Sequence, residues 1–110
     1  MADAVVTQRV LDDGTTIIDL RGELDIAVND ALRGVFLTVM DTRPPRLVVN
    51  MRHVKFVDST GIGALVAGFN AAQEAGVDFQ VHDVAPFVEK QLRAVGLYAL
   101  LVPGSSTDRS

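Results

Sequence analysis

Cysteine is absent from the 110 residues, which excludes disulfides, thiolate metal sites and thiol catalysis. Tryptophan is also absent and aromatic residues make up 5% of the chain, so a stacking platform for nucleic-acid bases is not expected. Basic residues are not in excess: the formal net charge is −4, which argues against nucleic acid and anionic membranes as partners. The sequence shows neither a signal peptide nor an apolar run of membrane-spanning length, so we expect a cytoplasmic protein.

Hydrophobic residues account for 48% of the chain, which is enough to build one core. No internal repeat, linker or composition shift divides the sequence. We therefore expect a single domain over residues 1–110, with an ordered core at about 4–102 and a polar C-terminal tail at 103–110.

Hydrophobic periodicity predicts an α/β fold with a hairpin at its start. Apolar residues alternate, or run together, in segments that read as strands at 4–11, 15–20, 46–50, 77–82 and 98–102. Spacings of three and four predict helices from about 27 to 42, 62 to 75 and 85 to 95. Turn and stop signals fit these bounds: Asp13-Gly14, Pro44-Pro45, Gly76 and Gly96. We predict a central mixed sheet of four to five strands with helices packed mainly on one face.

The stretch 56–63, Phe-Val-Asp-Ser-Thr-Gly-Ile-Gly, joins a predicted buried strand to a predicted helix. It places Ser59 in the first helical turn, where backbone N–H groups lack partners and the helix dipole is positive. One interpretation makes Ser59 the helix N-cap. The other makes it a regulated hydroxyl, because the same N–H groups can accept a phosphate. The two interpretations do not exclude each other.

Two glycines follow closely, although glycine in a helix costs about 1 kcal/mol relative to alanine. Gly61 and Gly63 indicate either tight packing against the sheet or close approach by a partner such as a kinase. They do not form a nucleotide loop, because the third glycine of a dinucleotide motif and the Gly-Lys-Ser/Thr of a P-loop are missing.

A serine hydrolase is disfavoured, because Val57 stands where the first glycine of Gly-x-Ser-x-Gly should be. The two histidines, His53 and His82, show no metal-ligand spacing. Asp25, in Gly-Glu-Leu-Asp at 22–25, is either a turn residue or a second carboxylate near Ser59. It would lie beside Asp58 if the first and third strands were neighbours, and the two could then orient the serine or hold Mg²⁺.

Three segments in order resemble the STAS domain family, the sulphate transporter and anti-sigma factor antagonist domains. The first is Gly-Glu-Leu-Asp at 22–25, and the second is Asp-Ser-Thr-Gly-Ile-Gly at 58–63, preceded by Val54-x-Phe56-Val57. The third is Ala85-Pro86 with Leu92, Val95, Gly96 and Leu97. The resemblance covers about residues 4–102 and implies a STAS-like fold.

For a short chain, the resemblance implies a bacterial anti-sigma factor antagonist that is not itself an enzyme. Such a protein binds an anti-sigma factor that is also a serine kinase, and so releases a sigma factor. The kinase supplies ATP and Mg²⁺ and phosphorylates the serine after the motif's aspartate, here Ser59, which ends binding. A serine phosphatase reverses the modification. The resemblance implies no cofactor for the antagonist, and implies partner contacts at Asp25, Asp58, Thr60, Gly61 and Ile62.

Two alternatives stay open at this point. The chain could be a constitutive STAS module, such as a stressosome or transport accessory subunit, that is never phosphorylated. It could also be a nucleotide-binding domain, for which the sequence offers no phosphate loop. Thr60 replaces a serine often found in the family and adds a second candidate hydroxyl.

Overall fold

The four strands of the protein form one mixed sheet in the order β1-β2-β3-β4. The structure, a computed structural model, describes residues 5–103. The strands are β1 (Val5–Val10), β2 (Thr16–Leu24), β3 (Arg46–Val57) and β4 (Asp78–His82). β1 pairs antiparallel with β2 through the predicted turn, where Gly14 has φ 92°. β2, β3 and β4 are mutually parallel, so the predicted fold class is confirmed.

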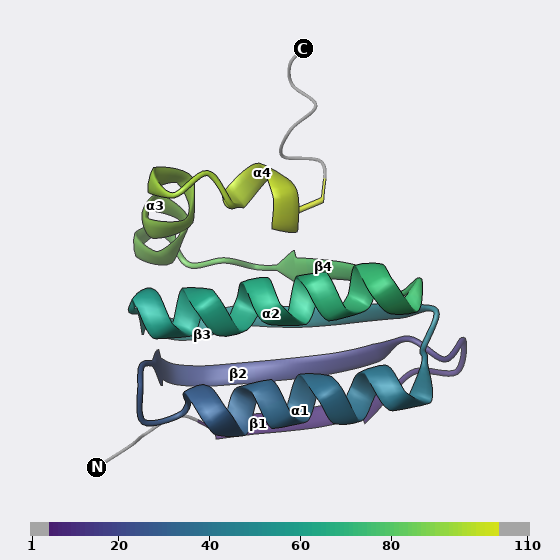
Figure 1. The fold of residues 1–110 in the computed structure, drawn as a ribbon. Coiled ribbons are helices and arrows are strands. Elements are labelled where there is room, and N and C mark those ends of the chain that lie inside the picture. The colour runs from purple at the N-terminus through teal and green to yellow at the C-terminus, as the bar shows by residue number, and fades with distance from the viewer. Residues whose placement is uncertain (1–4, 104–110) are drawn as a thin grey trace.

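Two long helices lie side by side across one face of this sheet (Figure 1). They are α1 (Asn29–Thr42), which ends before the two prolines, and α2 (Ser59–Ala75), which ends at Gly76 with φ 74°. Between them and the sheet lies the apolar core, in which Phe36 and Phe69 each meet the ring of Phe79 edge-on. None of the helices in residues 5–103 is long and apolar enough to cross a membrane.

The C-terminal part begins with α3 (Pro86–Ala94), which has proline at its first position as predicted, and ends with α4 (Tyr98–Leu101). The predicted fifth strand at 98–102 is therefore wrong. Gly96, with φ 78°, reverses the chain, and the Leu101 amide then donates to the Leu97 carbonyl as in a helix. Leu101 is buried in the core while Leu100 is 54% exposed, so this segment packs with one face, as a helix does.

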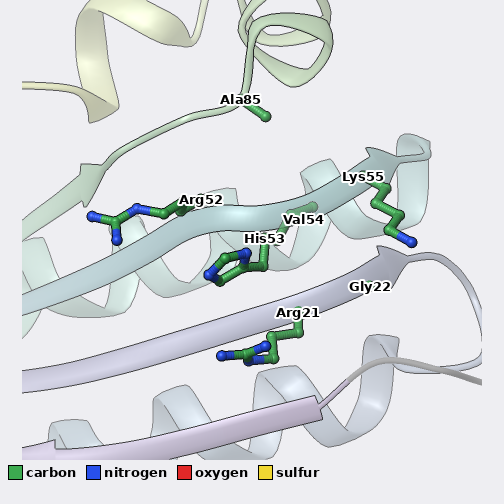
Figure 2. A pocket seen from close by; sticks show the side chains of 7 residues that line it. All are labelled: Arg21, Gly22, Arg52, His53, Val54, Lys55 and Ala85. Carbon is green, nitrogen blue, oxygen red and sulfur yellow. The ribbon is translucent and has the colours of Figure 1, made fainter.

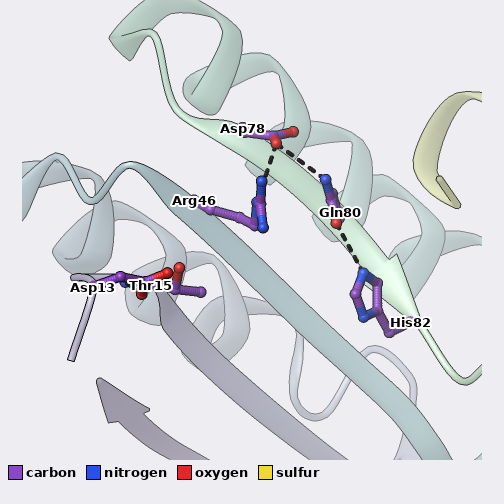
Figure 3. A network of polar contacts seen from close by, with 6 residues as sticks. All are labelled: Asp13, Thr15, Arg46, Asp78, Gln80 and His82. Atoms are coloured by element: carbon purple, nitrogen blue, oxygen red, sulfur yellow. Dashed lines mark hydrogen bonds and ion pairs between the residues drawn. The ribbon is translucent and has the colours of Figure 1, made fainter. Parts of the chain in front are cut away.

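The opposite face of the sheet carries polar side chains along β4 (Figure 3). The Asp78 carboxylate accepts hydrogen bonds from Arg46 Nε at 3.2 Å and from Gln80 Nε2 at 3.0 Å, and Gln80 Oε1 lies 2.9 Å from His82 Nε2. At the β1–β2 turn, the backbone N–H and then the hydroxyl of Thr15 lower the pKa of Asp13. The predicted strand at 77–82 is thus confirmed as β4, with one buried and one polar face.

Strand β3 continues to Val57, seven residues beyond the predicted end at Asn50. Its partner β2 also continues, to Leu24, although two register shifts interrupt the pairing. Because β2 lies between β1 and β3, the first and third strands are not neighbours, and the condition stated for Asp25 to lie beside Asp58 is not met. The second and third strands are neighbours instead, and their ends bring Asp25 and Asp58 to the same edge of the sheet.

Candidate functional site

The junction of β3 and α2 is held by the side chain of Asp58. Asp58 is the N-cap, with extended backbone, and its Oδ1 accepts hydrogen bonds from the Gly61 amide at 2.9 Å and the Thr60 hydroxyl at 2.6 Å. The Thr60 hydroxyl, and after it the Gly61 amide, hold the pKa of Asp58 below its ordinary value. The carboxylate thus satisfies one of the free N–H groups of the helix start and fixes Thr60.

Ser59 is the first residue of α2 and is exposed. The interpretation of Ser59 as the N-cap is therefore wrong, because Asp58 takes that role one residue earlier. Within residues 5–103, no side chain or backbone group makes a hydrogen bond with the Ser59 hydroxyl. The Ser59 hydroxyl is consequently presented to solvent at a helix N-terminus, whereas the Thr60 hydroxyl is engaged inside the junction.

The two glycines of the junction differ in their surroundings. Gly61 is buried, and a Cβ added there would lie 2.3 Å from the carbonyl oxygen of Leu24 and 2.9 Å from its Cβ. A Cβ on Gly63 would meet only the flexible end of Arg33, at 3.3 Å. Gly61 is thus required for packing of α2 against the end of β2, whereas a methyl group at Gly63 would require only a small shift of the Arg33 side chain.

Asp25 forms the turn between β2 and α1. Its Oδ1 accepts a hydrogen bond from the Ala27 amide at 3.0 Å, so the turn interpretation is confirmed. The adjacent Ile26 is 75% exposed, and its amide adds a smaller contribution to the lowered pKa of Asp58. The strand ends are linked directly, since the Asp58 amide donates to the Leu24 carbonyl at 3.0 Å. Asp25 and Asp58 therefore flank the helix start on two neighbouring loops.

Asn29 connects the two helices at this edge and was not singled out from the sequence as a site residue. Its Nδ2 donates to the Thr60 carbonyl, and its Oδ1 accepts from Arg33 Nε at 2.8 Å. Asn29 and Thr60 are 31 positions apart, so no local signal in the sequence could pair them. The hydrogen bond fixes the start of α2 relative to the start of α1.

Exposed apolar side chains border the junction. Phe56, two residues before the cap and 38% exposed, stacks on Phe87 of α3, which is 56% exposed, with ring centroids 6.5 Å apart. The Gln91 side chain holds α3 in place, because it both accepts from the Val57 amide at 3.2 Å and donates to the Val57 carbonyl at 2.5 Å. Together with Ile26 and the half-buried Ile62, these rings make the rim of the site apolar.

The described part of the chain shows neither a metal-binding cluster nor a base beside Ser59. Residues 5–103 contain no group of three or more His, Asp or Glu side chains placed to hold a metal ion. His82 contacts Gln80. The predicted end of the third strand at Asn50 placed His53 after that strand, but His53 lies within β3. Neither histidine forms a hydrogen bond with Ser59, so the arrangement lacks the base of a serine nucleophile.

Comparisons with known proteins agree with the fold. A family model described as "Mlab, STAS domain" matches residues 7–103. The anti-sigma F factor antagonist of Paenibacillus polymyxa is 28% identical over 89 residues, which cover 80% of this chain and 76% of the relative.

Among solved structures, an anti-sigma factor antagonist from Mycobacterium paratuberculosis superposes with a TM-score of 0.76 at 24% identity, covering 92% of this chain and 86% of the other. The Bacillus cell fate determinant SpoIIAA in its phosphorylated form superposes with a TM-score of 0.66 at 20% identity, covering 84% and 85%. These two likenesses concern the fold. With the family model matched over almost all of the described residues, the chain belongs to the STAS domain family.

Proposed function

We propose that this protein is an anti-sigma factor antagonist, and that phosphorylation of Ser59 switches off its binding to an anti-sigma factor. The observation that carries the proposal is the exposed Ser59 hydroxyl, which has no hydrogen-bond partner within residues 5–103 and stands at the first position of a 17-residue helix. The Paenibacillus relative, named as an anti-sigma F factor antagonist, supports the assignment of the partner. The existence of a SpoIIAA structure in a phosphorylated form, with the same fold, supports phosphorylation as the proposed modification.

The proposed modification requires a second protein. The kinase partner supplies ATP and Mg²⁺, and Ser59 Oγ attacks the γ-phosphorus while the bond from that phosphorus to the ADP oxygen breaks. A base of the kinase takes the serine proton. The antagonist needs no catalytic group of its own, and its contribution is an accessible hydroxyl on a rigid helix start. A serine phosphatase would return the hydroxyl by hydrolysis.

The switch follows from charge placed in a contact surface. A phosphate adds about −1.5 to −2 charges at neutral pH. The Asp25 and Asp58 carboxylates already lie at this edge, and the apolar rim of Ile26, Phe56 and Phe87 suits a partner that excludes water. Burying the added charge there would cost several kcal/mol, and each ~1.4 kcal/mol weakens affinity tenfold.

We assign different roles to the predicted partner-binding residues. Asp25, Ile62 and the backbone at Thr60 would contact the partner, and Asp58 would hold the loop in its binding conformation. Gly61 is buried against Leu24, so its contribution would be the close packing that sets the position of Ser59.

The test uses the purified protein with its cognate anti-sigma factor kinase, ATP and Mg²⁺, followed by intact-mass measurement. Wild-type protein and Thr60→Ala should gain one phosphate, whereas Ser59→Ala should gain none. In a binding assay with the anti-sigma factor, Ser59→Ala should bind like wild type and Ser59→Asp should bind at least about tenfold more weakly.

Two outcomes would contradict the proposal. Equal binding by the Ser59→Ala and Ser59→Asp variants would exclude the switch. Binding without any phosphate gain by wild type would instead favour a constitutive interaction module.

A further inference from the structure

A groove of about 670 Å³ lies on the sheet, and its lining includes none of the residues of the Ser59 junction. It is lined by residues of two neighbouring strands and one residue of the segment before α3, namely Arg21, Gly22, Arg52, His53, Val54, Lys55 and Ala85. Arg21 of β2 and His53 of β3 are paired in the sheet. Figure 2 shows His53 between β2 and β3, the Arg21 side chain on the β1 side of β2, and Arg52 and Lys55 on either side of His53 along β3. The volume falls within the range of about 300–1,000 Å³ that is usual for small-molecule sites.

The lining of this groove is basic in an acidic protein. It contains two arginines, a lysine and a histidine and no carboxylate, although the chain as a whole has a formal net charge of −4. Arg52 is paired with Asp83 at 2.8 Å. The side chains of Arg21, His53 and Lys55 have no hydrogen bond or ion pair with any residue in the described part of the chain.

The strand pairing is irregular at this place. Register shifts in the β2–β3 ladder occur between Asp19 and Arg21 and again between Gly22 and Glu23, so they bracket the two β2 residues of the groove. Gly22 between them has φ 95°. Bulges of this kind change the direction of side chains and are frequent beside functional sites. Here both Arg52 and His53 are exposed, although a regular strand would alternate them.

The far edge of β3 is also open along the groove. β4 pairs with β3 only as far as Asn50, and further along β3 the Gln91 side chain forms hydrogen bonds with the backbone N–H and C=O of Val57. Between these points β3 has no strand neighbour on this side within residues 5–103. Backbone N–H groups at such an edge are donors that can add to the cationic side chains around an anion.

We propose that this groove binds a compact polyanion of the oligophosphate type, held by Arg21, His53 and Lys55. Arginine donates in a fork that matches two phosphate oxygens, and lysine adds a point charge. The groove contains no Phe, Tyr or Trp on which a base could stack. Recognition is therefore of the phosphate chain, and a nucleoside triphosphate should bind no more tightly than inorganic tripolyphosphate.

The experiment is a titration of the full chain with tripolyphosphate at low salt, followed by backbone amide chemical shifts. Saturable shift changes should centre on residues 21–22 and 52–55. Lys55→Gln should weaken binding about tenfold, as expected when one charged donor is lost. The matched control is Lys90→Gln, which removes an exposed lysine of α3 outside the groove lining and should change affinity by less than about twofold.

Further arms separate this proposal from its alternatives. Arg21→Gln should weaken binding as Lys55→Gln does. Because Lys55 is exposed, the Lys55→Gln measurement stands even if the Arg21→Gln variant fails to fold. Ser59→Ala should bind tripolyphosphate like wild type, so the result is independent of the proposed phosphorylation switch. The proposal is overturned if no saturable shifts appear, if Lys90→Gln weakens binding as much as Lys55→Gln, or if ATP binds tenfold more tightly than tripolyphosphate.

Discussion

Replacement of Gly61 by alanine adds one methyl group where the start of α2 meets the end of β2. The new Cβ would lie 2.3 Å from the Leu24 carbonyl oxygen, whereas carbon–oxygen contacts are normally about 3.3–3.6 Å. One of the two elements must therefore move by about 1 Å. The same carbonyl accepts the Asp58 amide at 3.0 Å, so the displacement also strains the hydrogen bond that joins the two loops.

The size of the effect follows from two opposing contributions. Overpacking of a tight site costs about 1–3 kcal/mol, with more when backbone atoms must move. Alanine in place of glycine returns at most about 1 kcal/mol through helix propensity. We therefore expect Gly61→Ala to lower the free energy of unfolding by about 1–2 kcal/mol, which corresponds to several degrees in Tm for a domain of this size.

The matched control is Gly63→Ala, two residues further along the same helix. Its Cβ would meet only the movable end of Arg33 at 3.3 Å, so the propensity gain should dominate and the variant should be as stable as wild type or up to about 1 kcal/mol more stable. Urea unfolding followed by circular dichroism, with equal m-values, measures both changes. A Gly61→Ala variant at least as stable as wild type would refute the packing role of Gly61.

Two other substitutions test the contacts that hold the site. Asp58→Ala should destabilise the protein at pH 7, and the difference in stability from wild type should shrink as the pH falls. Folding lowers the pKa of the Asp58 carboxylate, so this group stabilises the fold above its unfolded-state pKa of about 3.9 and no longer does so once it is protonated in the folded protein. Urea midpoints at a series of pH values measure this, and a difference that stays constant down to pH 2 would contradict it. Gln91→Ala should lower the free energy of unfolding by about 1–3 kcal/mol, because it leaves the N–H and C=O of the buried Val57 unpaired. The control Lys90→Ala, at an exposed neighbouring position, should change this free energy by less than about 0.5 kcal/mol. Equal effects of the two variants in thermal unfolding would exclude the role of Gln91.

Local chemistry in the sequence determined most of the fold. The alternation at Val77 to Val81, the Asp13-Gly14 turn, the two prolines after α1 and the glycine after α2 each act within a few residues, and each appears in the structure as predicted. The Asp-Ser-Thr-Gly motif likewise placed the start of α2, because capping depends on groups three residues apart. The family resemblance rests on these local features too.

The tertiary structure decided what depends on partners distant in sequence. Whether 98–102 forms a strand depends on what packs against it, and here Leu101 enters the core in a short helix. β3 extends to Val57 because β2 runs beside it, while Gln91, 34 positions away, satisfies its last residue.

Contacts between residues distant in sequence also decided the roles of the residues at the site. Asp58, not Ser59, caps α2, and the Asn29 amide holds Thr60 from 31 positions away. Gly61 and Gly63 look equivalent in the sequence, but only Gly61 meets the carbonyl of Leu24. Sequence alone could name the exposed serine as a candidate. The packing of strands and helices decided which neighbouring groups are engaged inside the junction, because those contacts exist only once the sheet has formed. The same packing left the Ser59 hydroxyl facing solvent.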